Sequence, residues 1–202
     1  ADHAARLESI RAQTIAAVRT LFWDEKKSCF LLFADYSKNG TLRATESGVS
    51  ELVQALAVLT GVADERQREL LLPRLADGDP SWMRCTLSMI RFRFEALLTE
   101  PELYTERVFA DIAEIWGKML YAGASSFWET EDGADAFDDA GSLCHGWSAM
   151  PVYFYYAFRL GIRPQRPGFA GMEEQTEQHT AAPGCTGSVP TPWGMIHVRP
   201  AE

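Results

Sequence analysis

Residues 125–151, SSFWETEDGADAFDDAGSLCHGWSAMP, differ in composition from the segments of helical spacing on either side. The stretch combines carboxylates and one His with large aromatic residues, and it contains no Lys or Arg. Exposed loops usually lack Trp, and protein cores usually lack unpaired carboxylates. Aromatic faces beside carboxylates and an imidazole suit a polar, ring-shaped ligand, and a sugar is the obvious case. The stretch therefore predicts a ligand-contacting loop.

Apolar residues recur at helical spacing along most of the remaining chain. The pattern predicts helices over residues 2–22, 46–59, 65–75, 82–98, 102–123 and 148–162. The last of these is apolar on nearly all sides, which indicates burial all round. Its aromatic residues are expected to pack in the core. Loop 125–151 then joins two helices at one end of a helical array.

Local signals mark several boundaries of these helices. Asn39–Gly40 is a turn signal that closes the short apolar run CFLLFADY, which is expected to be extended. Gly61 is placed to follow the end of one helix, and Asp64 to cap the start of the next. Pro73 is expected to disturb the far end of that helix.

The fold class predicted from these elements is mainly α, with antiparallel helical hairpins and a short β-type tail. Residues 1–163 are expected to form the helical array. From residue 164 onward, Pro and Gly become frequent and the segment MIHV alternates, which predicts a loop and short strands over residues 164–202.

Composition restricts the classes of partner. The chain has 202 residues and a formal net charge of -9, which disfavours nucleic acid and anionic membranes. No run reaches the roughly 20 apolar residues of a membrane helix. The first residues do not form a signal peptide, so a cytoplasmic location is favoured. The chain begins without Met, which suggests processing or a fragment of a longer protein.

The sequence predicts no metal site and no cofactor. The four Cys residues are widely separated and lack zinc-ligand spacing, so reduced thiols are expected in place of a zinc site. The acidic run after Thr130 lacks the spacing of an EF-hand, which favours a solvated loop over a calcium site. The run comprises Glu131, Asp132, Asp135, Asp138 and Asp139.

Three segments carry a resemblance to a known family. They are GASSFWET, residues 123–130, HGWSAMPVYFYYAFRLGIRPQRPGF, residues 145–169, and GSVPTPWGMIHV, residues 187–198. Together they resemble the C-terminal part of α-L-rhamnosidases of glycoside hydrolase family 78. FWDEKKSCF and QALAVLTGV fit the preceding hairpins. The resemblance implies part of a six-hairpin (α/α)6 toroid, followed by the beginning of a C-terminal β-domain.

The resemblance also implies an activity and residue roles. The activity is inverting hydrolysis of terminal α-L-rhamnose by two carboxyl groups on opposite faces of the sugar. The general base of the family is the Glu of an (S/T)xWE motif, which falls on Glu129. The His after the loop matches His145, which would hold a sugar hydroxyl. Trp128 and Trp147 could present their rings to the sugar.

The chain departs from the family pattern at two points. Many relatives have a second Trp two residues after the motif Glu, where this chain has Glu131. The acidic stretch that holds the general acid in the family is absent from this chain. The resemblance therefore implies a portion that is inactive alone. Its partners would be a rhamnoside substrate and either the missing N-terminal half or a second copy that covers the exposed apolar face.

Other interpretations of the same residues stay open. The chain could be a non-catalytic helical module that binds a carbohydrate or a protein through the same loop, or a six-hairpin hydrolase for another deoxy or uronic sugar. Glu129 could be a capping or ion-paired loop residue, and His145 a structural donor. Trp128 and Trp147 could belong to the core.

Overall fold

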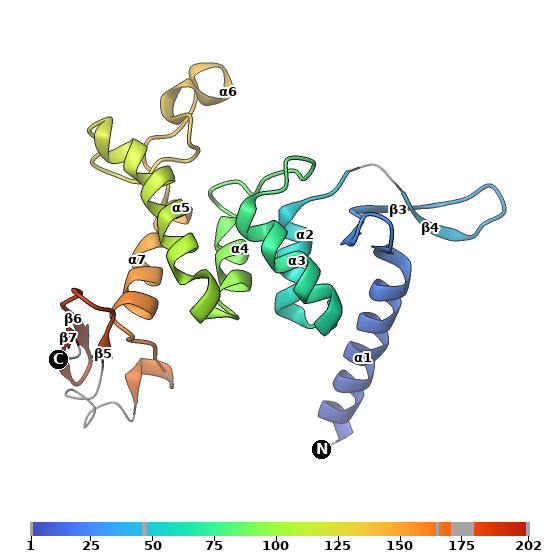
Figure 1. Ribbon diagram of the computed structural model, residues 1–202, viewed down its shortest axis with the longest axis horizontal. Coiled ribbons are helices and arrows are strands. Elements are labelled where there is room, and N and C mark those ends of the chain that lie inside the picture. Colours follow the sequence, from blue (N-terminus) through green and yellow to red (C-terminus); the bar gives the residue numbers. More distant parts are fainter. Residues whose placement is uncertain (1, 46–47, 165, 171–179, 201–202) are drawn as a thin grey trace. The chain divides into compact units, whose positions relative to one another are not determined.

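The computed structural model describes residues 2–45, 48–164, 166–170 and 180–200 and confirms a mainly α fold with a short β tail. The chain divides into two compact units, residues 1–144 and 145–202. The first unit holds α1–α6 and the second holds α7 and the C-terminal strands (Figure 1).

The first unit begins with a long helix followed by two small β-hairpins. Helix α1 spans Asp2–Phe22, and β1 (Trp23–Asp24) pairs antiparallel with β2 (Cys29–Phe30). Strand β3 (Phe33–Tyr36) pairs antiparallel with β4 (Leu42–Thr45). Gly40 adopts φ +79° in the turn between them, which is a conformation that favours Gly. The extended segment and its turn signal are thus confirmed.

Four helices build the core of this unit, and their bounds are α2 Glu51–Thr60, α3 Glu65–Asp77, α4 Ile90–Leu97 and α5 Pro101–Tyr121. Helix α2 packs against α3 and α4, and α5 packs against α3 and α4. Leu71, Leu75, Phe94, Leu97 and Val108 are fully buried between them. Burial of such side chains contributes roughly 1.5–3 kcal/mol each.

Predicted caps are confirmed at two boundaries. Gly61 follows α2 in the left-handed conformation, with φ 76°. Asp64 and Gln67 form a reciprocal capping box at the start of α3. The predicted start of α2 at residue 46 is wrong, because the helix begins at Glu51 after the cap Ser50. Pro73 lies inside α3, which continues to Asp77.

The predicted helix over residues 82–98 is wrong in its first half, because α4 begins only at Ile90. The segment around Met83 and Cys85 instead forms hydrogen bonds with residues 49–51, at the start of α2. The Met83 N–H donates to Val49 O at 2.8 Å, and the Glu51 N–H donates to Met83 O at 3.0 Å. The Cys85 N–H donates to a Glu51 carboxylate oxygen at 2.8 Å. These bonds satisfy backbone groups that a helix would otherwise pair.

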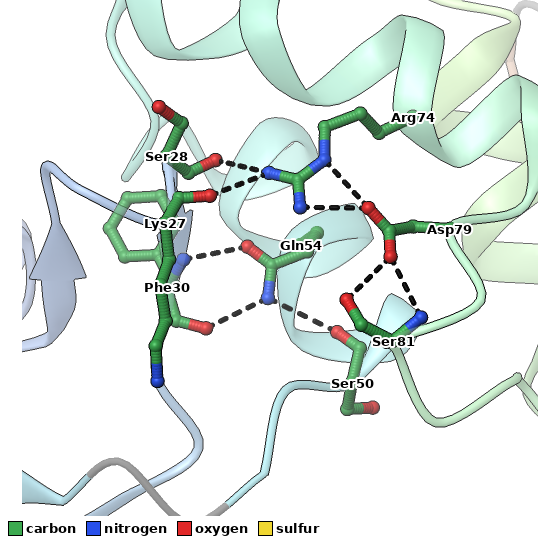
Figure 2. A network of polar contacts seen from close by, with 8 residues as sticks. All are labelled: Lys27, Ser28, Phe30, Ser50, Gln54, Arg74, Asp79 and Ser81. Carbon is green, nitrogen blue, oxygen red and sulfur yellow. Dashed lines mark hydrogen bonds and ion pairs between the residues drawn. The ribbon is translucent and has the colours of Figure 1, made fainter.

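The amide of Gln54 fastens the β1–β2 hairpin to α2 (Figure 2). Gln54 is fully buried. Its Oε1 accepts from the Phe30 N–H at 2.8 Å, and its Nε2 donates to Phe30 O at 2.9 Å and to Ser50 O at 3.2 Å. The side chain therefore pairs with Phe30 as a neighbouring strand would. A buried polar group needs such partners.

The second unit combines a short helix with a small sheet. Helix α7 spans Pro151–Phe154 and continues as a π-helical turn, Tyr155–Arg159. Strand β7 (Gly194–Pro200) pairs antiparallel with β6 (Gly187–Thr191) and parallel with β5 (Thr180–Ala181). Leu160, Ile162, Val189, Ile196 and Val198 form the apolar core of the unit. The predicted short strands of the tail are present.

The expectation that the helix over residues 148–162 is buried on all sides is wrong. Phe154 is fully buried, but Val152, Tyr153 and Tyr155 each expose nearly half of their surface. Tyr tolerates this position because its ring is apolar and its hydroxyl is polar. These three side chains, on α7 and on the π-helical turn that follows it, are therefore largely open to solvent in the described structure.

We predict that Gln54→Leu lowers the free energy of unfolding by about 3 kcal/mol, because the Phe30 N–H and C=O would lose their partner in a buried place. The matched control is Gln13→Leu, on the exposed face of α1. This substitution should change the free energy of unfolding by less than about 0.5 kcal/mol. Urea denaturation of the two variants measures both values. Equal stability of the two variants would contradict the assigned role.

Candidate functional site

The loop that follows α5 is closed by hydrogen bonds between its two ends. The Ser126 hydroxyl donates to Leu143 O at 2.5 Å, and the Glu129 N–H donates to Ser142 O at 2.8 Å. Helix α6, Ala136–Asp139, lies between these ties. Its Phe137, Asp138 and Asp139 have φ of 55–66°, so it is a left-handed turn. A left-handed backbone at non-Gly residues stores strain.

Glu129 is held at the base of this loop. Its side chain is half-buried, and its Oε2 accepts from the Ser142 N–H at 3.2 Å. Together with the Glu129 N–H, this contact fixes residue 129 against residue 142 through two hydrogen bonds. The carboxylate is therefore oriented by the backbone of residue 142. A carboxylate positioned in this way can act as a general base. It can equally be a structural residue whose hydrogen bond stabilises the loop.

Trp128 packs against its own loop. Gly133 has φ +60°, and a Cβ added there would lie 2.8 Å from Cε3 of the Trp128 indole. Part of the indole surface is thus covered by the Gly133 backbone. Trp128 is half-buried, so the rest of the ring borders solvent. The predicted role of Trp128 as a sugar platform stays a prediction.

His145 and Trp147 lie together at the start of the second unit. Their rings stack with centroids 4.0 Å apart and planes inclined by 25°. The His145 carbonyl accepts from the Ser148 hydroxyl at 2.8 Å, which supports the turn that presents both rings. Trp147 is half-exposed. One face of its indole is occupied by the imidazole, so only the other face can meet a ligand.

A polar cavity of about 500 Å³ lies between α5 and the connection from α3 to α4. From α5 it is lined by Arg107, Asp111, Glu114 and Lys118, which are spaced as one face of a helix. The connection contributes Trp82 and Arg84 among others, and Glu131 of the loop also lines it. The sequence patterns do not predict this cavity. The only signal for it was the charged stripe along residues 107–118.

A network of polar contacts shapes the wall formed by the α3–α4 connection (Figure 2). Arg74 donates to Asp79 Oδ2 from Nε at 3.0 Å and from Nη2 at 2.8 Å. The Asp79 Oδ1 accepts from the Ser81 N–H and hydroxyl at 2.8 and 2.5 Å. Arg74 also stacks over the Trp82 ring at 4.3 Å. These contacts hold Trp82 in place.

The titration of two groups follows from this environment. Hydrogen bonds from Ser81, and then from Arg74, lower the pKa of Asp79, although desolvation opposes them. Burial raises the pKa of the Cys85 thiol to about 12, because it disfavours the thiolate. At physiological pH the Cys85 thiol is therefore kept in its neutral form, which is the weakly nucleophilic one. All four Cys residues are free thiols.

The described residues give no indication of a metal site or a membrane span. No group of His, Cys, Asp or Glu side chains within them is placed to bind a metal ion. Within the same part of the chain, no helix combines the length and apolar character that a membrane crossing needs. Glu131 of the acidic run pairs with Lys118 at 3.5 Å.

We predict that Gly133→Ala destabilises the loop, because Ala disfavours the left-handed conformation and its Cβ would meet the Trp128 ring. The matched control is Gly123→Ala, where φ is +80° but nothing lies within 4 Å. Gly133→Ala should cost about 2 kcal/mol more than Gly123→Ala in urea unfolding followed by Trp fluorescence. Equal costs would show that Trp128 does not pack on Gly133.

We predict that Asp79 makes folding sensitive to acid. Because its pKa is lowered in the folded state, its contribution to stability is fully present above the ordinary Asp value of 3.8 and is lost as the pH falls through the folded pKa. The free energy of unfolding should therefore drop below about pH 4. Asp79→Asn should flatten this part of the profile, measured by thermal unfolding between pH 2 and pH 6. An unchanged slope would contradict the assignment.

No family model and no curated protein matches this chain. The crystal structure of a GH78 family rhamnosidase of Bacillus sp. GL1 matches with a TM-score of 0.69 and 26% identity, over 91% of this chain and 19% of that chain. A rhamnosidase from Klebsiella oxytoca with rhamnose bound matches with a TM-score of 0.53 and 23% identity. That match covers 75% of this chain and 28% of that chain.

The chain thus spans 19% and 28% of the lengths of these two rhamnosidases. The Klebsiella match shows the fold alone, whereas the Bacillus match covers nearly the whole chain. The resemblance that the sequence motifs predict is confirmed by structure: the chain has a glycoside hydrolase-like fold and resembles GH78 family rhamnosidases.

Proposed function

We propose that this chain is a portion of an inverting glycoside hydrolase that releases terminal α-L-rhamnose, with Glu129 as the general base. The observation that carries the proposal is the match to the Bacillus sp. GL1 rhamnosidase over 91% of the chain, together with the FWE motif in a closed loop. The helices would then form part of an (α/α)6 toroid.

The chemistry assigned to Glu129 is removal of a proton from the attacking water. In an inverting enzyme this water approaches the face of the sugar opposite to the leaving group, and the two carboxyl groups stand about 6.5–9.5 Å apart. The bonds between residues 129 and 142 support this role, because a base has to be held within hydrogen-bond reach of its water. His145 would bind a sugar hydroxyl, and Trp128 and Trp147 would contact the ring.

The general acid would come from helical hairpins outside this chain. The family holds it in an acidic stretch that these 202 residues lack, so the chain alone is expected to be inactive. Exposed apolar residues on α1, such as Leu7 and Ile10, support a surface that further helices cover. The covering element would be the N-terminal half of the catalytic domain or, failing that, a second copy of the chain.

The alternative is a non-catalytic module that binds a carbohydrate or a protein. One observation favours it, namely that the Glu129 carboxylate already accepts a backbone N–H and so serves the loop structure. The two functions differ in whether the carboxylate is needed for turnover or only for folding. Replacement of the carboxylate by an amide separates them, because the amide oxygen can still accept the Ser142 N–H.

We predict that Glu129→Gln lowers kcat for an aryl α-L-rhamnoside about 10³-fold, the magnitude typical of a lost general base. The assay uses the full-length protein encoded by the reading frame that contains this chain. Folding, followed by thermal unfolding, should be unchanged. Azide needs no base, so it should restore turnover and yield a rhamnosyl azide of inverted configuration.

The matched control is Asp132→Asn, which removes an exposed carboxylate from the same loop and should leave kcat unchanged. A Glu129→Gln enzyme with kcat within tenfold of the unmodified enzyme would refute the role of Glu129. If the unmodified protein shows no detectable turnover of any α-L-rhamnoside, the result would favour the non-catalytic binding module.

A further inference from the structure

Residue 142 contacts Glu129 at both ends of the glutamate. The Glu129 N–H donates to Ser142 O at 2.8 Å, and the Ser142 N–H donates to Glu129 Oε2 at 3.2 Å. A Glu side chain has high rotamer entropy, so its carboxylate stays in one place only where contacts hold it there. The position of the Glu129 carboxylate therefore follows the position of the backbone at residue 142.

The backbone at residue 142 is fixed by side-chain contacts, because residues 141–145 belong to no helix or strand. The Ser142 hydroxyl donates to Cys144 O at 3.2 Å and accepts from the Cys144 N–H at 3.3 Å. A Ser hydroxyl that binds backbone groups close by in the sequence closes a local turn. The hydroxyl of Ser142 thus holds the same segment whose N–H reaches Glu129.

Two contacts from the first half of the loop hold this segment from its other side. The Ser126 hydroxyl donates to Leu143 O at 2.5 Å. Gly141 lies so close to Gly133 that an added Cβ would stand 1.9 Å from the Gly133 carbonyl oxygen. The neighbours of residue 142 on both sides are therefore held by the loop. The Ser142 hydroxyl adds the contact made by residue 142 itself.

We propose that Ser142 is a positioning residue for the Glu129 general base, because its hydroxyl fixes the backbone whose N–H orients the carboxylate. The proposal rests on the proposed function for the role of Glu129. A general base has to stand within hydrogen-bond reach of the proton that it removes, and a misplacement of about 1 Å costs on the order of 10²-fold in rate. Ser142 touches no reacting atom and acts on the chemical step through Glu129 alone.

The first test is the kinetics of Ser142→Ala in the full-length protein, with an aryl α-L-rhamnoside as substrate. We expect kcat to fall about 30-fold while KM stays within about twofold, since the hydroxyl serves the base and not substrate binding. Ser142→Thr keeps a hydroxyl and should bring kcat back to within about threefold of the unmodified enzyme. The matched control is Ser125→Ala, which removes an exposed hydroxyl from the same loop and should leave kcat unchanged.

The second test separates positioning from a general structural role. Azide-driven turnover by Glu129→Gln uses no base, so adding Ser142→Ala to that variant should leave this turnover within about twofold. Two residues that act as one unit show such non-additive effects. A residue that merely stabilises the site would lower azide-driven turnover as well, and that result would overturn the proposal.

The third test reads the backbone without any turnover. Hydrogen exchange of the peptide that spans residues 126–144, followed by mass spectrometry, should be faster in Ser142→Ala than in Ser125→Ala. Ser126→Ala releases the same segment through Leu143 and should show the same faster exchange and the same loss of kcat. It carries the kinetic tests if thermal unfolding shows that Ser142→Ala is not folded. Exchange that matches the control, or a loss of activity that lies in KM, would refute the positioning role.

The positioning role and the proposed function fail in different ways. If Glu129→Gln loses turnover while both Ser142→Ala and Ser126→Ala retain it, the positioning role falls and the proposed function stands. If Glu129→Gln retains turnover, the base assignment falls, and the role of Ser142 falls with it.

Discussion

The buried guanidinium of Arg93 is the constraint on which the helical unit depends. It donates to Leu75 O at 2.6 Å, to Ala76 O at 3.1 Å and to Asp111 at 2.6 Å, and so joins the C-terminal turn of α3 to α4 and α5. A charge taken out of water is costly unless its hydrogen bonds are replaced. Here helix-end carbonyls and a carboxylate replace them, because carbonyls at a helix C-terminus attract a cation. The tie sets how α5 faces the α3–α4 connection.

This geometry explains why a cavity lies beside α5, although the sequence of α5 has the pattern of an ordinary amphipathic helix. The apolar side of α5 carries Val108, Ile112 and Trp116, all buried. Its charged side would meet solvent on an isolated helix, but the Arg93 tie brings it opposite the α3–α4 connection. That connection is itself held open by the Arg74–Asp79 contacts (Figure 2). Two rigid walls with opposing polar groups thus enclose space that side chains do not fill.

Much of the fold could be predicted from sequence because its signals are local. The caps at Gly61 and Asp64 act within one helical turn, and both predictions are confirmed. The segment before Ile90 could not be predicted, since its backbone bonds go to residues 49–51, which are distant in sequence. Helical spacing continues through it, but tertiary hydrogen bonds override the propensity. The cavity was missed for the same reason, as its lining comes from separate elements.

The candidate catalytic loop differs in how much of it could be predicted from the sequence. The FWE motif located Glu129 without any knowledge of its contacts, whereas the left-handed turn at residues 137–139 had no local signal, since Phe and Asp rarely adopt it. A strained turn persists only when its surroundings determine it. Here the ties of Ser126 and Glu129 close the loop beneath it. The Lys118–Glu131 pair then joins this loop to the stripe of α5. The residues proposed to act on a glycosidic bond and the charged stripe of α5 therefore stand on adjacent parts of the chain, which an ion pair joins.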